Sequence, residues 1–256
     1  MKKLHGVKMK DLWSYADKPL KHIVIAGVRI PYRVDRRNVR NTRLEFRKGE
    51  LLVVLSPSES SEAEILKEKQ KWVLKNYLKI CERRNQIRTW HDESQIMIMG
   101  KPFTFVEYVE GHGVWIDFER KAIHMNRKIQ RHKSQVKNIL KRKLAEEIHK
   151  RINMFSEELG RNPNGFRIKT QKTSWGSCSS KQNLNFNLKL IFLPPELVDY
   201  VVFHEILHLR YMSHGKRFRA VMKKRFRNVK QLEDKLATWW HYVQMAPVAE
   251  LLTKSI

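Results

Sequence analysis

Four residues late in the chain have the types and spacing of a hydrolytic metal site. His204 and His208 are four positions apart, so on a helix they lie on one face, one turn apart, and both imidazoles can reach a single ion. Glu205 leaves such a helix about 100° away from His204, beside the metal rather than on it. His214 follows His208 by six positions, which leaves room for a turn that brings in a third nitrogen ligand. This spacing predicts a site with three histidine ligands.

The chemistry of such a site depends on its fourth position. Three protein ligands leave one place open for water, which distinguishes a catalytic zinc site from a closed structural one. A carboxylate beside that water can accept its proton. We therefore expect one zinc ion per chain, with Glu205 as the general base. The flanking residues, among them Val201 and Val202, supply the apolar faces of a buried helix, which is the element that this chemistry needs. The alternative is three unrelated histidines on a core helix.

The elements around this stretch predict an α+β protein. Pro194-Pro195-Glu196 should open the metal-site helix, because proline is tolerated in a first turn and a carboxylate there suits the helix dipole, and the helix should run to about Tyr211. A helix pattern from residue 133 to Gly160 and strands within 166–188 precede it. We divide the chain provisionally into a β-rich part with one helix, residues 1–129, and a metal-site part, residues 130–256.

Charge and composition limit the partners. The 256-residue chain has 52 Lys and Arg against 26 Asp and Glu, a formal charge of +26, and is 41% hydrophobic. Such a charge fits nucleic acid, a ribosome, an acidic substrate or high intracellular salt, or simply well-solvated helix and strand faces. The chain has two cysteines and no stretch near the length of a membrane span, and its start does not resemble a signal peptide. We expect a soluble cytoplasmic protein.

Several ordered motifs together resemble the YgjP-like zinc metallopeptidases. The similarity covers roughly residues 165–226, with a weaker similarity at Arg43 to Pro57 and in the helix that carries Trp72. The motifs are Trp175-Gly176-Ser177-Cys178-Ser179, Leu184-Asn185-Phe186-Asn187, Pro194-Pro195, Val198-Asp199-Tyr200-Val201-Val202, His204-Glu205-x-x-His208-Leu209, and His214 with Phe218.

The resemblance implies a zincin-like C-terminal part, in which the metal-site helix packs on a small antiparallel sheet. It implies His204, His208 and His214 as ligands and Glu205 as the base. More distantly the chain is similar to the SprT-like and WLM proteases, which act on DNA-attached proteins. The chain differs from many metzincin-type sites at one position. They have a glycine three residues after the second histidine, where it makes the turn, and this chain has Tyr211 there.

The function that follows is zinc-dependent hydrolysis of peptide bonds through a metal-bound water, with a protein or peptide substrate. We predict substrate contacts from an exposed strand edge near Asn185 or Asn187, and from Trp175 and Tyr211. Cys178 is a candidate nucleophile or fourth ligand, although the histidines already complete a catalytic set. Two alternatives stay open: a metal-dependent hydrolase of phosphoanhydrides or nucleotides, and a nucleic-acid-associated protein with a stabilising zinc.

Overall fold

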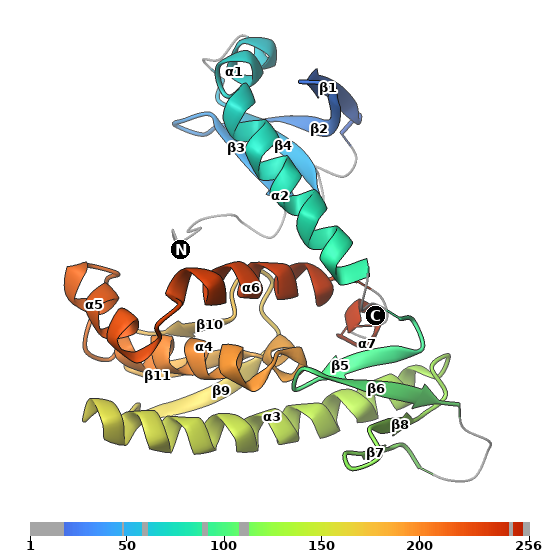
Figure 1. The fold of residues 1–256 in the computed structure, drawn as a ribbon, viewed down its shortest axis with the longest axis vertical. Coiled ribbons are helices and arrows are strands. Elements are labelled where there is room, and N and C mark those ends of the chain that lie inside the picture. The colour runs from blue at the N-terminus through green and yellow to red at the C-terminus, as the bar shows by residue number, and fades with distance from the viewer. Residues whose placement is uncertain are drawn as a thin grey trace. The chain divides into compact units, whose positions relative to one another are not determined.

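The fold is α+β, as the sequence predicts, and the chain divides into two compact units, residues 1–86 and 87–256 (Figure 1). A computed structural model of the chain describes residues 18–47, 49–57, 61–88, 92–107, 113–245 and 248–252. In the part of the chain that these ranges cover, no helix is long and apolar enough to cross a bilayer.

In its described residues, the first unit contains one sheet and two helices, the second of which ends just beyond the unit. Its strand order is β1-β2-β4-β3, and β2 runs parallel to β4 while the other pairs are antiparallel. Ser61 caps the first helix by accepting a hydrogen bond from the N–H of Ala63. The central strand β4 is buried on both faces, since Leu51 to Leu55 are all at most 1% exposed. The elements are β1 (Lys21–Ile25), β2 (Val28–Arg36), β3 (Arg43–Arg47), β4 (Glu50–Leu55), α1 (Glu62–Glu68) and α2 (Gln70–Arg88).

The second unit begins with a sheet of order β5-β6-β8-β7. Its strands are β5 (Gln95–Ile98), β6 (Lys101–Val106), β7 (Trp115–Asp117) and β8 (Ala122–His124). The provisional boundary at 129/130 lies inside this unit. The reason is that β5 and the turn after it bond directly to later parts of the chain. The Met97 N–H donates to the Tyr242 hydroxyl at 2.7 Å, and the Met99 N–H donates to the Ile191 carbonyl at 2.7 Å. Sequence periodicity could not show these long-range bonds.

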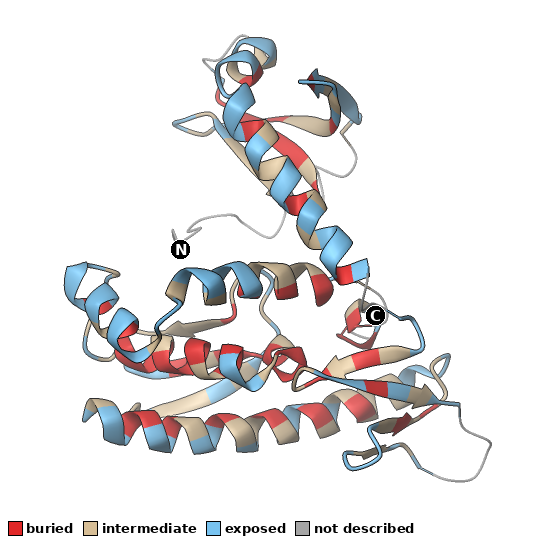
Figure 2. Cartoon of the chain, in the orientation of Figure 1, coloured by how far each residue is buried: buried red, intermediate tan, exposed pale blue. Residues whose placement is uncertain are grey.

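The remaining elements of the second unit surround the metal-site helix α4. They are α3 (Gln130–Leu159), β9 (Gly165–Lys169), β10 (Gly176–Cys178), β11 (Asn183–Asn187), the 3-10 helix η2 (Leu188–Phe192), α4 (Pro195–Leu207), α5 (Lys216–Arg225), α6 (Val229–Tyr242) and α7 (Val248–Leu252). Helix α4 lies between α3 and α6 (Figure 1). Helix α3 has a buried stripe at helical spacing, from Val136 to Phe155, and an exposed opposite side (Figure 2).

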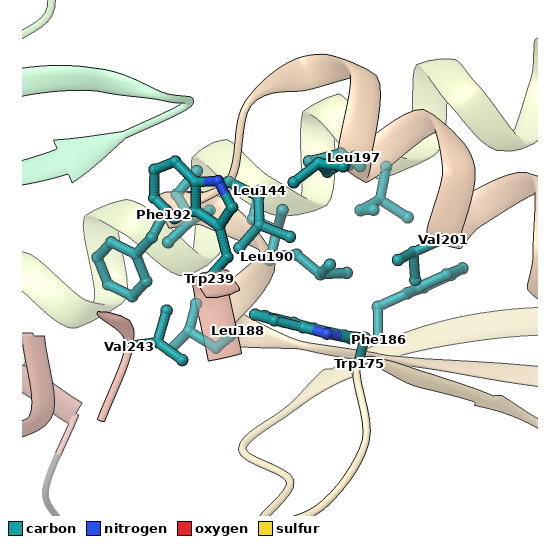
Figure 3. Close-up of a cluster of buried hydrophobic side chains, with 14 of the residues drawn as sticks. Leu144, Trp175, Phe186, Leu188, Leu190, Phe192, Leu197, Val201, Trp239 and Val243 are labelled. Atoms are coloured by element: carbon teal, nitrogen blue, oxygen red, sulfur yellow. The ribbon is translucent and has the colours of Figure 1, made fainter. Parts of the chain in front are cut away.

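A single core fills the second unit and holds α4 in place. Leu144 of α3, Leu190 of η2, Val201 of α4 and Trp239 of α6 all belong to it, and Figure 3 shows part of this cluster. Burial of nine of the thirteen α4 residues explains why the helix is apolar almost all round. An ion pair adds to the attachment on one side, where Arg151 of α3 donates to Asp199 of α4 at 2.6 Å.

The sheet against α4 is mixed rather than antiparallel. Its order is β10-β11-β9, and β10 pairs antiparallel with β11, as the resemblance implies. Strand β9, however, runs parallel to β11, because the connection from β9 passes through β10 before the chain enters the middle strand. The sheet therefore has its two outer edges at β9 and β10, and β10 is the strand beside α4.

Candidate metal centre

Helix α4 starts where the sequence predicts and ends one turn earlier. Pro195 and Glu196 occupy its first turn, which suits a residue without an N–H and a negative charge at the positive end of the helix. The last helical residue is Leu207 rather than Tyr211. The Leu207 carbonyl accepts from the N–H groups of both Arg210 and Tyr211, which tightens the chain into a turn. Tyr211 does not have a positive φ, so this turn needs no glycine there.

The turn brings the three predicted histidines together. One ligand nitrogen from each of His204, His208 and His214 lies within 4.8 Å of the other two. The Nε2 atoms of His204 and His214 are 3.0 Å apart. Two nitrogen ligands of a tetrahedral zinc site lie about 3.3 Å apart, given Zn–N distances of about 2.0–2.1 Å. The spacing therefore fits a small ion such as zinc.

The protonation of the imidazoles suits metal binding as well. Burial, together with the neighbouring His208 and His214, lowers the pKa of His204 to about 3, so this ring is neutral at physiological pH. A metal ligand must offer an unprotonated nitrogen. His208 places its Nδ1 2.9 Å from the Tyr211 carbonyl, which can only accept, so Nδ1 carries the proton and Nε2 is left free as a ligand. The turn thus fixes the tautomer of its own histidine.

Phe218 lies against all three imidazoles. Its ring centroid is 4.9 Å from that of His204 and 4.8 Å from those of His208 and His214. Phe218 is 3% exposed and comes from α5, the helix that follows His214. An apolar wall on one side of the histidines restricts their rotamers and excludes water from that side. The sequence marked Phe218 only as an inward-facing residue and as part of the family resemblance.

Glu205 is buried beside the histidines with one oxygen unsatisfied. The residue is 6% exposed, and its Oε2 has no hydrogen-bond partner in the described part of the chain. Burial raises the pKa of this carboxyl to about 8. A buried polar atom without a partner costs stability unless an ion, water or substrate completes its environment. A cation on the three imidazoles would favour the ionised carboxylate and so bring the pKa of Glu205 back down.

A glycine allows β10 to approach Glu205 closely. A Cβ atom at Gly176 would lie 2.8 Å from the Glu205 Cγ and 2.9 Å from its Oε1, which is closer than real side chains come. Any other residue at this position would push the carboxylate out of place. Gly176 is therefore part of the site by virtue of its missing side chain. The Trp-Gly-Ser motif pointed to the segment, but the reason for the glycine appears only in three dimensions.

The two predicted asparagines do not lie at a strand edge. Asn185 is on β11, the middle strand, and its side-chain amide donates to the Ser177 hydroxyl on β10 at 3.3 Å. Asn187 is fully buried, and its amide donates at 2.8 Å to the carbonyls of both Gln171 and Ser174. This side chain organises the loop before β10 and has no donor left for a ligand. The free edge on the side of α4 belongs to β10, and the Asn187 amide is fully used inside the protein, which corrects its prediction as a substrate contact.

The other candidates also have structural surroundings. Trp175 is 6% exposed and packs edge-on against Trp240 with ring centroids 4.8 Å apart, so it is a core residue. Tyr211 contributes its carbonyl to His208, and its partly exposed ring lies 5.5 Å from the Arg210 guanidinium carbon. Cys178 lies outside the cluster of ligand atoms among the described residues. Burial and the Glu205 carboxylate raise the pKa of its thiol, which disfavours a nucleophilic thiolate.

Comparison with known proteins identifies a metallopeptidase family. The family described as YgjP-like, metallopeptidase domain, matches residues 40–238, well beyond the segment 165–226. Among solved structures, the metallopeptidase zymogen jannalysin of Methanocaldococcus jannaschii is 24% identical, with a TM-score of 0.33, over 36% of this chain and 88% of that one. The zymogen abylysin of Pyrococcus abyssi is 23% identical, with a TM-score of 0.34, over 36% and 92%. No curated protein matches the chain.

Proposed function

The chain belongs to the YgjP-like metallopeptidase family, and from this premise we propose that it is a zinc-dependent peptidase with Glu205 as its general base. Membership of the family makes it a metal-dependent peptidase that acts on proteins or peptides. The observation that carries the finer proposal is the arrangement of three imidazole nitrogens within 4.8 Å of one another, next to a buried carboxylate whose Oε2 has no partner among the described residues. His204, His208 and His214 would hold the ion.

A zinc ion bound there supplies Lewis acidity, which polarises a carbonyl group and makes water more acidic. The protein's own residues do the rest. Glu205 accepts the proton of the attacking water and then donates it to the amine that leaves when the peptide bond breaks, so the carboxylate is regenerated. With the ion in place the carboxylate is ionised, which is the form that can accept this proton. Phe218 and the Tyr211 carbonyl hold the imidazoles in position.

The substrate backbone would pair with β10. This strand is an outer strand of its sheet and contacts α4, so an extended peptide added to its free edge runs past the metal centre. Gly176 to Cys178 then offer main-chain groups rather than side chains to the peptide. Such pairing recognises extended backbone with little dependence on sequence, so any sequence preference must come from residues further out.

Activity and metal content of the wild type and Glu205→Gln test the proposal together. Both proteins are loaded with zinc and given a casein-like protein and a panel of nucleotides. We expect about one zinc per chain in both, and protein cleavage by the wild type only. Release of phosphate from nucleotides, lost equally in Glu205→Gln, would keep the site and overturn the reaction class. Protein cleavage that persists in Glu205→Gln would contradict the role of the glutamate.

A further inference from the structure

The segment after the metal-site helix is basic and contains no acidic residue. Between Ile206 and Leu232 there is no Asp or Glu, whereas nine Lys or Arg residues occur between Arg210 and Lys230. The chain as a whole has one acidic residue for every two basic ones. The imbalance here is therefore local and exceeds the overall excess of positive charge. We call these nine residues the α5 basic face, because most of them lie on α5, although Arg210, Arg227 and Lys230 lie just outside it.

The α5 basic face is exposed, and its charges are almost entirely unneutralised. All nine residues are exposed, and Figure 2 shows that α5 is exposed over most of its length. Within the described residues, only Arg225 makes an ion pair, with Glu158 at 3.2 Å. Basic residues elsewhere in the unit do have acidic partners: Arg151 pairs with Glu147 and Asp199. Unpaired charges of one sign at high density repel each other, so a complementary partner would be stabilising.

The α5 basic face is also directly attached to the metal centre. Helix α5 begins two residues after His214, and its inward residue Phe218 contacts all three imidazoles. With Phe218 and Met222 facing inward, the residues on the opposite side of the helix, among them Lys216, Lys223 and Lys224, face solvent. A helix with its side chains is about 10–12 Å across, so these charges lie roughly that far from the histidines.

We propose that the α5 basic face binds an acidic segment of the polypeptide substrate next to the bond that is cleaved. This inference rests on the proposed peptidase function and names a substrate class for the same site. The ten residues of α5 span about 15 Å, and an extended chain advances about 3.3 Å per residue. An acidic stretch of about four or five residues would therefore match the length of the helix.

Charge complementarity favours an acidic polypeptide over nucleic acid at this place. The basic residues adjoin the proposed peptidase centre. One polypeptide can therefore bind the α5 basic face and also enter the site, whereas a nucleic acid bound there would be a molecule separate from the peptide substrate. In nucleic-acid binding, aromatic side chains commonly interleave with the basic ones and stack on bases. Of the three aromatic residues in this segment, Phe218 is buried and Phe226 is partly buried. The third, Tyr211, has a partly exposed ring near Arg210, before α5 begins, so the helix itself offers charge without a stacking surface.

The test compares binding and cleavage of matched peptides. Fluorescent peptides share one central sequence and have four flanking Glu, four Gln or four Lys, on either side of it. Binding is measured by fluorescence anisotropy with zinc-loaded Glu205→Gln, which leaves the peptide intact, and kcat/KM is measured with the zinc-loaded wild type. The variant is Lys223→Glu with Lys224→Glu. The control is Lys141→Glu with Arg142→Glu, an equal change of charge at exposed positions of α3.

We expect the Glu peptide to bind at least about tenfold more tightly than the Gln peptide, and this preference to fall about tenfold in the Lys223/Lys224 variant but little in the control. The preference should also weaken as salt is raised, because the charges are exposed. Equal binding of Glu and Gln peptides by the wild type would overturn the inference. An equal loss in the α3 control would overturn it too, since net charge rather than the α5 basic face would then be responsible.

The binding arm separates this inference from the proposed function. Selective binding of the Glu peptide without cleavage of any peptide would support the α5 basic face and contradict the peptidase. Cleavage of Gln and Glu peptides with equal kcat/KM would support the peptidase and contradict the acidic preference. If the Lys223/Lys224 variant does not fold, Lys216→Glu with Arg219→Glu replaces it, because acidic residues near the start of a helix are favourable. The same variant is also tested with a labelled single-stranded DNA. If it bound this DNA more weakly than the wild type does but kept the wild-type preference for the Glu peptide, the partner of the α5 basic face would be nucleic acid and the inference would be overturned.

Discussion

Gly176→Ala would place a methyl group against the side chain of Glu205. The added carbon would lie 2.8 Å from the Glu205 Cγ, whereas two carbons in contact prefer about 3.5–4.0 Å. The overlap of about 0.7 Å or more cannot be relieved by a flexible side-chain end, because Glu205 is buried on the rigid helix α4. Overpacking of this kind costs about 1–3 kcal/mol. We expect a loss of stability of that size, and a loss of peptidase activity because the carboxylate must move.

A matched control is available on the same sheet. An alanine Cβ at Gly165 would meet its nearest atom, the Asn183 Oδ1, at an ordinary 3.7 Å, so Gly165→Ala should be nearly neutral. The opening free energy is measured in the metal-free protein by hydrogen–deuterium exchange of the α4 amides, which report on the second unit alone. A double-mutant cycle with Glu205→Ala isolates the contact. Without the Glu205 side chain, Gly176→Ala should cost about 1–3 kcal/mol less than it does in the wild type.

Either of two results would contradict a close contact between Gly176 and Glu205. A cost of Gly176→Ala no larger than that of Gly165→Ala would mean that the two segments do not approach as closely as the structure shows. Alternatively, the cost could be unchanged in the Glu205→Ala background, which would show that the added methyl group meets something other than Glu205.

Two further predictions concern the same site. Glu205→Gln should stabilise the metal-free protein by on the order of 3 kcal/mol at pH 7. The pKa of Glu205 is about 8 in the folded protein and about 4.3 in the unfolded chain. The stability of the wild type therefore falls as the pH rises from about 4.3 to about 8, whereas glutamine does not titrate. The difference in Tm between variant and wild type, measured by calorimetry with a chelator, should therefore grow from pH 5 to pH 8; a constant difference would contradict it. Phe218→Leu should weaken zinc binding about tenfold, as measured by competition with a chromogenic chelator, because the wall behind the imidazoles is lost. Phe226→Leu, which removes a ring that packs on Tyr200 and Phe203 instead, should leave zinc affinity unchanged.

The local features of the site were readable from the sequence because helix geometry is regular. A spacing of four residues fixes the relation of His204 to His208, and the apolar flanks fix the helix as a buried one. The structure brings His214 to the same point, as the spacing predicts. The α+β class follows in the same way from the change between alternating and helical periods along the chain.

The features that the sequence did not reveal depend on contacts between distant segments. The end of α4 at Leu207, rather than Tyr211, is set by a turn whose hydrogen bonds no residue pattern announces. The parallel pairing of β9 with β11 placed Asn185 in the middle of a sheet, so a pattern of alternating residues could not identify the free edge. The bond from the Met97 N–H to Tyr242 joins segments 145 positions apart, and no local pattern shows that the β5 to β8 sheet lies in the same compact unit as the metal-site helix.

The zinc affinity of three proteins tests whether three histidines hold the metal with Glu205 beside it. The dissociation constant is measured for the wild type, Glu205→Gln and His214→Ala by competition with a chelator of known affinity. We expect about one zinc per chain in the wild type, affinity that is no weaker in Glu205→Gln, and affinity weaker by roughly a hundredfold or more in His214→Ala, since even an outer-shell change costs about 10–100-fold. Undiminished affinity in His214→Ala, or loss of zinc in Glu205→Gln, would contradict the assignment of three histidine ligands with a glutamate beside the metal.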